Sequence, residues 1–307
     1  MRVTERDRAD RCPGVLRPWI ADDGALVRLR LVGGRLSLDA LARLVDVAAE
    51  HADGHLHLTK RANVQLRAIS HDEGCVDEAF VEAVEATGLL PSRTHELVRN
   101  VMVSPLSGRS GGQADLRHAA TRYDALVCDD PELAALSARF LVVLDDGRGD
   151  LVDRSLDLGA MAVSPDAAQL RVGSDGWGEV VPVADLPEAL VALAHRFLAA
   201  TTPPPEVRGT SLEGGAPAAR PWHVDELPDG GATVLGAAHA RDLRTHVTAL
   251  PLPHGPIPQD DGRFAEHVAV PDGRLTPDLA AQVIARAHRE VVVTPWRSLL
   301  LPDLENA

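Results

Sequence analysis

An internal repeat restricts the fold of this 307-residue chain more than any other feature of its sequence. The segment LVGGRLSLDALARLVDVA at 31–48 matches VPDGRLTPDLAAQVIARA at 270–287. In each copy a Ser or Thr precedes an apolar pattern with helical spacing, which is typical of a helix N-cap. The sequence therefore predicts one supersecondary unit that occurs twice, once near each end of the chain.

A polar stretch, HLHLTKRANVQLRAI at 55–69, follows the first copy of the repeat. We interpret it as a single β-strand, whose side chains alternate between two faces. One face is apolar apart from a lysine, and the other is polar throughout. The polar face consists of His57, Thr59, Arg61, Asn63, Gln65 and Arg67. With the helices at 37–51 and 77–88 and the preceding strand patterns, this predicts a ferredoxin-like α+β unit.

The second copy of the repeat lacks the polar face. The segment EVVVTPWRSLLL at 290–301 aligns with HLHLTKRANVQL at 55–66, so Thr59 corresponds to Thr294. Arg61 and Gln65, however, correspond to Trp296 and Leu300. Because the second copy keeps the scaffold without the polar residues, a purely structural role for them in the first copy is disfavoured.

A different module lies between the two copies. RNVMVSPLSG at 99–108 and RFLVVLDDGRGD at 139–150 predict strands that lead into loops, and ADLPEALVALAHRFLAA at 184–200 predicts a helix. Pro and Gly are frequent at 201–221, which indicates a linker, and at 251–262, which indicates a second loop. We therefore divide the chain into ferredoxin-like repeat 1 (1–92), an α/β module (93–200), a linker (201–221) and ferredoxin-like repeat 2 (222–307).

Composition excludes several classes of function. The formal net charge is -14 and aromatic residues make up 3%, which argues against nucleic-acid binding. The N-terminus has no apolar signal-peptide core, and no apolar run approaches the ~20 residues of a membrane span. We therefore expect a cytoplasmic protein without a membrane partner. The three cysteines form no CxxC pair and indicate neither a disulfide framework nor a zinc site.

Basic residues are concentrated in two windows of this acidic chain. Residues 54–71 and 97–114 contain no Asp or Glu, although each window contains arginines. Arg61 and Arg67 can each bind a carboxylate through two hydrogen bonds, and Asn63 and Gln65 offer donors and acceptors. This set suits a large anion with several acidic groups. The alternative is chance clustering of charges on a solvated face. The Gly-rich loop after 99–106 matches no nucleotide-binding pattern.

Several ordered segments resemble the nitrite and sulfite reductase haemoproteins, and within them the precorrin-3B synthase branch. The segments that carry the resemblance are CPGVLRP, HLTKRANVQLRAI, RNVMVSPLSG, ARFLVVLDDGRGD and VTPWRSLLLP. The resemblance implies two ferredoxin-like repeats flanking an α/β module of sirohaem type, with a tetrapyrrole held through its carboxylates and a 4Fe–4S cluster beside it. The precorrin-3B synthases are oxygen-dependent and hydroxylate a precorrin on the way to cobalamin.

The resemblance also suggests site residues. The anion-binding arginines of the reductases correspond to Arg61 and Arg99, whereas Arg139 and Leu141 replace a lysine pair, so that reduction of sulfite or nitrite is disfavoured. The candidate tetrapyrrole-binding residues are Arg61, Asn63, Gln65, Arg67, Arg99, Asn100 and Arg139. No catalytic residue and no metal ligand is assigned.

The cysteines do not match the family's cluster array. Cys12, Cys75 and Cys128 are the only ones up to Ala307, so we expect no 4Fe–4S cluster on this chain alone. The first hypothesis is a precorrin-3B synthase-like oxidoreductase of cobalamin biosynthesis. The alternatives are a non-catalytic tetrapyrrole- or sirohaem-binding module, and a degenerate reductase-like protein that needs a partner chain for the cluster. An open face beside the third module would leave apolar surface exposed, which predicts a partner chain or self-association.

Overall fold

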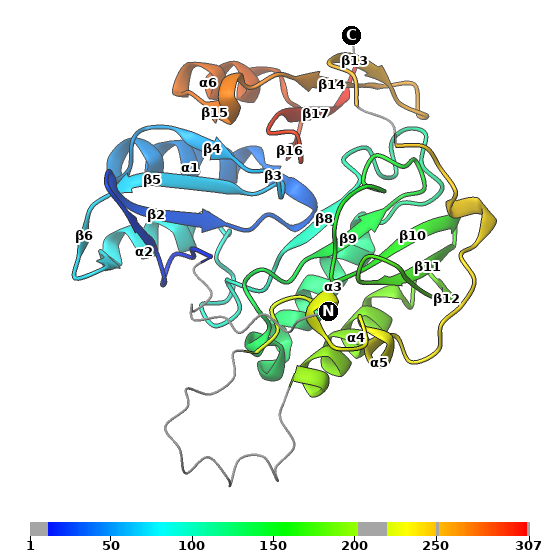
Figure 1. Cartoon of the computed structure of the whole chain (residues 1–307). Coiled ribbons are helices and arrows are strands. Elements are labelled where there is room, and N and C mark those ends of the chain that lie inside the picture. The colour runs from blue at the N-terminus through cyan, green and yellow to red at the C-terminus, as the bar shows by residue number, and fades with distance from the viewer. Residues whose placement is uncertain (1–11, 202–219, 250–251, 306–307) are drawn as a thin grey trace, which may run out of the picture.

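The computed structural model of the chain describes residues 12–201, 220–249 and 252–305. These residues form three five-stranded sheets and a small ribbon of β6 (His71–Asp72) and β7 (Cys75–Val76) (Figure 1). Two of the large sheets contain the copies of the repeat, and the third is the centre of the α/β module. The α+β fold class is confirmed. None of the described helices has the length and apolar character needed to cross a membrane.

The first repeat is a sheet covered on one face by helices. Its own strands are β1 (Trp19–Ala21), β2 (Gly24–Leu29), β4 (Leu56–Leu58) and β5 (Val64–Ile69). Helix α1 (Leu38–His51) begins where the Ser37 hydroxyl accepts a hydrogen bond from the Ala40 amide, as expected for an N-cap. Leu41, Leu44 and Ala48 of α1 are fully buried, and α2 (Glu78–Ala86) contributes to the same core.

The second repeat copies this arrangement. Its own strands are β13 (Gly255–Pro258), β14 (Phe264–Val268), β16 (Glu290–Val293) and β17 (Leu299–Leu304). Helix α6 (Pro277–Arg286) begins where the Thr276 hydroxyl accepts from the Leu279 amide. The predicted correspondence of Ser37 and Thr276 as helix caps is confirmed.

The two repeats exchange a strand with each other. Strand β3 (Arg35–Ser37) of the first repeat pairs with β16 of the second, and β15 (Arg274–Leu275) of the second pairs with β4 of the first. Buried side chains of both repeats, such as Leu44 and Val283, share one core. The repeats are therefore interlocked, and Figure 1 shows them side by side in blue-to-cyan and orange-to-red.

The α/β module has a mixed sheet with the order β12-β11-β10-β9-β8. Its strands are β8 (Val101–Val103), β9 (Val142–Asp145), β10 (Leu158–Ser164), β11 (Ala167–Val172) and β12 (Gly176–Pro182). The pairs β8·β9 and β9·β10 are parallel, and the others are antiparallel. The strands and helix predicted between the two copies of the repeat are therefore confirmed.

Three helices cover one face of this sheet. They are α3 (Arg117–Asp129), α4 (Leu186–Thr201) and the short α5 (Ala232–Leu235), which Figure 1 shows together beneath the strands. The core here includes Tyr123, Phe140 and Phe197, and also Val224 and Val234 from further along the chain. The segment after the predicted linker therefore packs on the α/β module before the chain enters the second repeat. Most of the predicted linker, 202–219, lies outside the described residues.

Two sequence-based predictions are wrong. Residues 55–69 do not form one strand, because β4 and β5 are separate strands of an antiparallel hairpin with a turn at 59–63. The loop predicted at 251–262 contains strand β13, which pairs with β14. In both cases the local pattern was ambiguous: the hairpin turn has no Gly or Pro, and β13 contains two prolines (Gly255–Pro258), which are tolerated because it is an edge strand.

Candidate functional site

The turn between β4 and β5 determines where Arg61 and Asn63 point. The Thr59 amide donates to the Asn63 carbonyl at 2.9 Å, and the Thr59 hydroxyl accepts from the Asn63 amide at 3.1 Å. Ala62 adopts a left-handed backbone with φ of 55°, which closes the turn. Arg61 therefore lies at the tip of a hairpin rather than on a strand face, and the strict alternation predicted for this stretch stops at Leu58 and resumes at Val64.

Asn63 and Asn100 join the first repeat to the α/β module. The Asn63 side chain is buried, and its Oδ1 accepts from the Leu31 amide at 2.8 Å. Its Nδ2 lies 3.5 Å from the Asn100 Oδ1. The Asn100 Nδ2 in turn donates to the carbonyls of Leu97 and Ala138, at 3.1 and 3.0 Å. Both amide side chains are thus committed to holding the junction between the two units.

Arg61 and Arg139 meet at this junction. The Arg61 Nη1 donates to the Arg139 carbonyl at 3.0 Å, and the Arg139 guanidinium stacks on the Trp222 ring at 4.9 Å from its centroid. Arg61 also lines a cavity of about 230 Å³, whose other walls include Leu141 and His223. Acidic side chains line the same cavity, namely Asp157, Asp225 and Glu226. The pocket is therefore lined by one arginine at the hairpin tip and by three acidic side chains.

Gln65 belongs to a polar row that crosses the first sheet. It pairs directly with Arg28 of β2 on one side and His57 of β4 on the other, and His57 pairs with Arg274 of β15. Paired residues point to the same side of a sheet, so these four side chains share one face, opposite α1. Arg67 is half-exposed at 41% and lies 3.3 Å from Asp23, away from the junction.

Arg99 is engaged in a buried ion pair. Its Nε and Nη2 each donate to one carboxylate oxygen of Asp124 at 2.7 Å, and the two side chains are 8% and 15% exposed. This bidentate contact occupies the two guanidinium donors, Nε and Nη2, that an external anion would otherwise bind. The structure thus brings Arg61 together with Arg139, and Asn63 with Asn100, whereas Arg67 and Arg99 have acidic partners of their own.

Sequence reasoning missed two basic residues of the same junction, Arg28 and Arg30. Burial lowers the pKa of both guanidinium groups, for Arg30 to about 10, and the neighbouring Arg61 charge lowers both further. The pKa of Arg28 is also lowered by the Arg139 charge, although the nearby Cys12 opposes this. A signal was present in the sequence, because the segment ALVRLRLV at 25–32 is rich in β-favouring residues and its two arginines are spaced by two residues.

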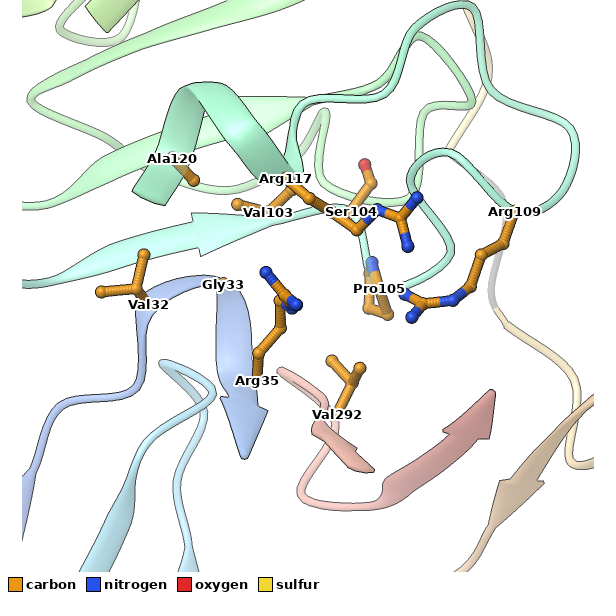
Figure 2. Close-up of a pocket in the computed structure, with 10 residues that line it drawn as sticks. All are labelled: Val32, Gly33, Arg35, Val103, Ser104, Pro105, Arg109, Arg117, Ala120 and Val292. Carbon is orange, nitrogen blue, oxygen red and sulfur yellow. The ribbon is translucent and has the colours of Figure 1, made fainter. Parts of the chain in front are cut away.

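A second arginine cluster is sealed by acids and does not form a ligand site. Figure 2 shows Arg35, Arg109 and Arg117 around a space between β3, β16 and the loop that follows β8. Glu290 contacts both Arg35 and Arg109, at 2.9 and 2.6 Å. Arg109 also contacts Asp303, and Arg117 is paired with Asp115. The remaining cavity is about 10 Å³, room for one water molecule, so these charges connect the module to the second repeat.

An acidic loop at 145–150 was also missed as a cluster. Asp145, Asp146 and Asp150 offer carboxylate oxygens within 4.8 Å of one another. Burial raises the pKa of Asp146 to about 6 and that of Asp150 to about 7. Arg148 lies against Asp146 at 3.3 Å and Asp150 at 3.8 Å, and the Ser104 hydroxyl donates to Asp150 at 2.6 Å. Arg148 therefore offsets part of the negative charge of this loop, and the Ser104 hydroxyl satisfies one of its carboxylates.

The class of fold follows from the interlocked repeats and their junction with the α/β module. Residues 21–73, which lie in the first repeat, match the family model of the nitrite/sulfite reductase ferredoxin-like half domain. Among solved structures, the NirA protein of Mycobacterium tuberculosis shares the fold with a TM-score of 0.67 at 21% sequence identity. The match covers 93% of this chain and 56% of NirA, so the chain spans little more than half of that protein. No curated protein sequence matches the chain.

Proposed function

We propose that this chain binds a polycarboxylate tetrapyrrole at the junction of the first repeat and the α/β module, as a precorrin-3B synthase-like oxidoreductase. The observation that carries the proposal is the convergence of Arg28, Arg61 and Arg139 from three separate segments on that junction. Guanidinium groups match carboxylates in geometry and retain their charge at physiological pH. The polar row that starts at Arg28 extends the basic surface across the sheet.

The iron–sulfur part of the family's chemistry has no fit among the described residues. The only group there of three or more acidic, His or Cys side chains with metal-ligand spacing is the acidic loop at 145–150, which contains no cysteine. Cys12 and Cys128 are partly buried and Cys75 is exposed, and no disulfide joins these three residues. We therefore derive no step through a cluster, and limit the role of this chain's residues to binding and orienting the ligand.

A non-catalytic binding module is the second candidate, and Leu141 favours it. Leu141 lines the cavity beside Arg61, at a position where the resemblance to the reductases implies a lysine. An apolar side chain there cannot stabilise a small oxyanion, whereas it can pack against a macrocycle. Anaerobic purification followed by an absorption spectrum separates the two candidates. A cluster or haem-like band supports the oxidoreductase, and binding of added porphyrin by a colourless protein supports the binding module.

Removing the Arg61 side chain tests the proposed site directly. We expect Arg61→Ala to raise the Kd for uroporphyrin, an octacarboxylate porphyrin, about tenfold, because one charge-assisted hydrogen bond contributes roughly 1.5–3 kcal/mol. Tryptophan fluorescence quenching measures the affinity. The control is Arg43→Ala, which removes a half-exposed arginine of α1 on the other side of the sheet. Equal affinity of wild type and Arg61→Ala would rule out this placement of the ligand.

We also propose that the chain associates with a partner chain or with itself. Leu16, Trp19 and Ile20 are 44%, 38% and 41% exposed, and they lie close together in the sequence at the start of the first repeat. Exposed apolar side chains in one neighbourhood favour a protein contact. Sedimentation velocity of the wild type and of Ile20→Ser tests this. A monomer at every concentration that also retains no partner during purification contradicts it.

A further inference from the structure

His223 is a partly exposed histidine whose ring is oriented by a buried carboxylate. It lies immediately before the short 3-10 helix at Val224–Glu226, and its side chain is 33% exposed, whereas that of Asp157 is 2% exposed. The His223 Nδ1 lies 3.3 Å from both carboxylate oxygens of Asp157. Because a carboxylate can only accept, Nδ1 carries the ring proton and Nε2 keeps its lone pair.

Asp157 is itself fixed by the backbone around it. Its Oδ2 accepts from the Leu141 amide and its Oδ1 from the Val224 amide, each at 2.8 Å. The Asp157 amide also donates to the Leu141 carbonyl at 2.9 Å, so the residue is held at three points. A carboxylate held in this way restricts rotation of the imidazole and strengthens its other ring nitrogen as an electron-pair donor.

The Nε2 of His223 is available to a ligand in the cavity at the hairpin tip. His223 lines this cavity, and among the described residues no group hydrogen-bonds to its Nε2. Two acidic residues of the same cavity are engaged elsewhere. Ser174 donates to both oxygens of Asp225, at 2.9 and 2.5 Å, and the Trp222 amide donates to Glu226 at 2.8 Å. Neither contact involves the His223 ring.

The neighbouring Trp222 ties His223 to the proposed ligand site. The Arg139 guanidinium stacks on the Trp222 ring, and the Arg139 carbonyl accepts from Arg61. His223 and Arg61 are therefore walls of one cavity, although they come from different ends of the chain. A metallated tetrapyrrole carries its carboxylates at the edge and its metal ion at the centre. One such ligand can thus engage a guanidinium and an imidazole at the same time.

We propose that His223 is an axial ligand for the metal ion of a tetrapyrrole bound at this cavity. The inference rests on the proposed function and names the group that binds the metal. Neutral imidazole is among the side chains that hold haem iron. The Nε2 lone pair forms the coordinate bond in place of a metal-bound water, and the Nδ1 proton stays with Asp157 as its hydrogen-bond partner. No proton is released, because Nε2 carries none.

His195 provides a matched comparison within the same chain. Its side chain is 35% exposed, close to that of His223, and it also contacts a carboxylate. However, its Nε2 lies 2.7 Å from Asp130 and its Nδ1 lies 3.5 Å from Glu132. Both ring nitrogens therefore face acidic groups, and His195 does not line the cavity. Removing it takes away a histidine of similar exposure without touching the proposed metal ligand.

Two porphyrins that differ only in their metal test the assignment on the full chain. The probes are iron(III) uroporphyrin and metal-free uroporphyrin, which carry the same carboxylates. We expect His223→Gly to raise the Kd for the iron form at least about tenfold and to leave the Kd for the metal-free form within about twofold. Added imidazole should restore the wild-type absorption and EPR spectra of the iron complex of His223→Gly. His195→Gly is the control and should change none of these quantities.

The outcomes separate the axial ligand from the proposed function. If wild type binds both porphyrins and His223→Gly keeps the affinity and spectra of the iron form, the assignment is overturned and the proposed function stands. If wild type binds only the iron form, and does so through His223, the assignment stands and the proposed carboxylate site fails. Binding of neither form overturns both. Should His223→Gly not fold, His223→Gln decides the result, because it lacks the imidazole and should lose the same affinity.

Discussion

The two ferredoxin-like repeats have the same skeleton but different outer faces. In both hairpins a threonine amide donates to a carbonyl four residues later at 2.9 Å, from Thr59 to Asn63 and from Thr294 to Ser298. Ala62 and Arg297 adopt the same left-handed backbone, with φ of 55° and 61°. The backbone of this unit is therefore specified by the hydroxyl, the turn and the apolar core, while the residues at the tip are free to differ.

The difference lies in what each outer face meets. In the first sheet this face carries Arg28, His57 and Gln65, which are only partly buried. In the second sheet the equivalent positions include Val292 and Leu300, which pack with Leu106 from the α/β module in a small apolar core. One copy has become a docking face for the rest of the chain, and the other has kept a polar face. The two copies thus differ in whether this face packs against the α/β module or remains partly exposed.

The largest expected effect tests whether the exchanged strands need the same glycine in both copies. A Cβ on Gly34 would lie 2.1 Å from the Val293 carbonyl oxygen, whereas on Gly273 its nearest contact is the Arg297 Cβ at 2.9 Å. We expect Gly34→Ala to lower the unfolding free energy by about 4 kcal/mol and Gly273→Ala by about 2 kcal/mol. Urea denaturation measures both. Gly54→Ala, with φ of +77° and open space, isolates the cost of the backbone angle.

Exchanging the face residues gives the next largest effect. Leu300 is fully buried, so Leu300→Gln should lower the unfolding free energy by about 3 kcal/mol, because it removes apolar contacts and buries an amide. The reciprocal change, Gln65→Leu, should stay within about 1 kcal/mol of wild type because that face is partly exposed. Urea unfolding of both variants measures the asymmetry. Similar losses in the two variants would show that the faces are equivalent after all.

The pH dependence of stability should distinguish His267 from Arg28, its counterpart in the first repeat. The two correspond because Arg28 pairs with Gln65 as His267 pairs with Leu300. Burial lowers the pKa of His267 below 6.5, and the stacked His254 adds to this. The unfolded chain therefore binds a proton near pH 6.5 that the folded chain does not, so stability falls as pH drops through this range. We expect His267→Gln to reduce that loss by about 1 kcal/mol between neutral and mildly acidic pH. Tm is measured for both proteins across this pH range, in which no arginine titrates. The same slope of Tm against pH in wild type and His267→Gln would contradict the prediction.

The sequence predicts the repeats, their helices and their caps because these depend on local patterns. Ser37 and Thr276 identify both helix starts, and the apolar spacing of α1 identifies its buried face. Strand exchange is not predictable in this way, since β3 and β15 are only three and two residues long and pair with strands far away in the chain. The hairpin at 59–63 was missed because an alanine, not a glycine, adopts the positive φ.

The candidate site was predicted only in part. Arg61 and Arg139 were proposed from a family resemblance, and no periodicity could have placed residues 78 positions apart beside each other. Arg99 was proposed in the same way, but its ion pair with Asp124 depends on how α3 packs on β8, which sequence patterns do not reveal. Arg28 and Arg30 could have been found, because their spacing of two residues is visible in the sequence.

The exchange of β3 and β15 also sets an order in which the chain can fold. Residues 35–37 obtain their strand partner only when residues 290–292 are available, whereas the strands and helices of the α/β module lie close together in sequence. Contacts this distant in the chain slow folding, and synthesis proceeds from the N-terminus. The α/β module can therefore form first on the ribosome. Strand β3 of the first repeat stays unpaired until residues 290–292 have been synthesised.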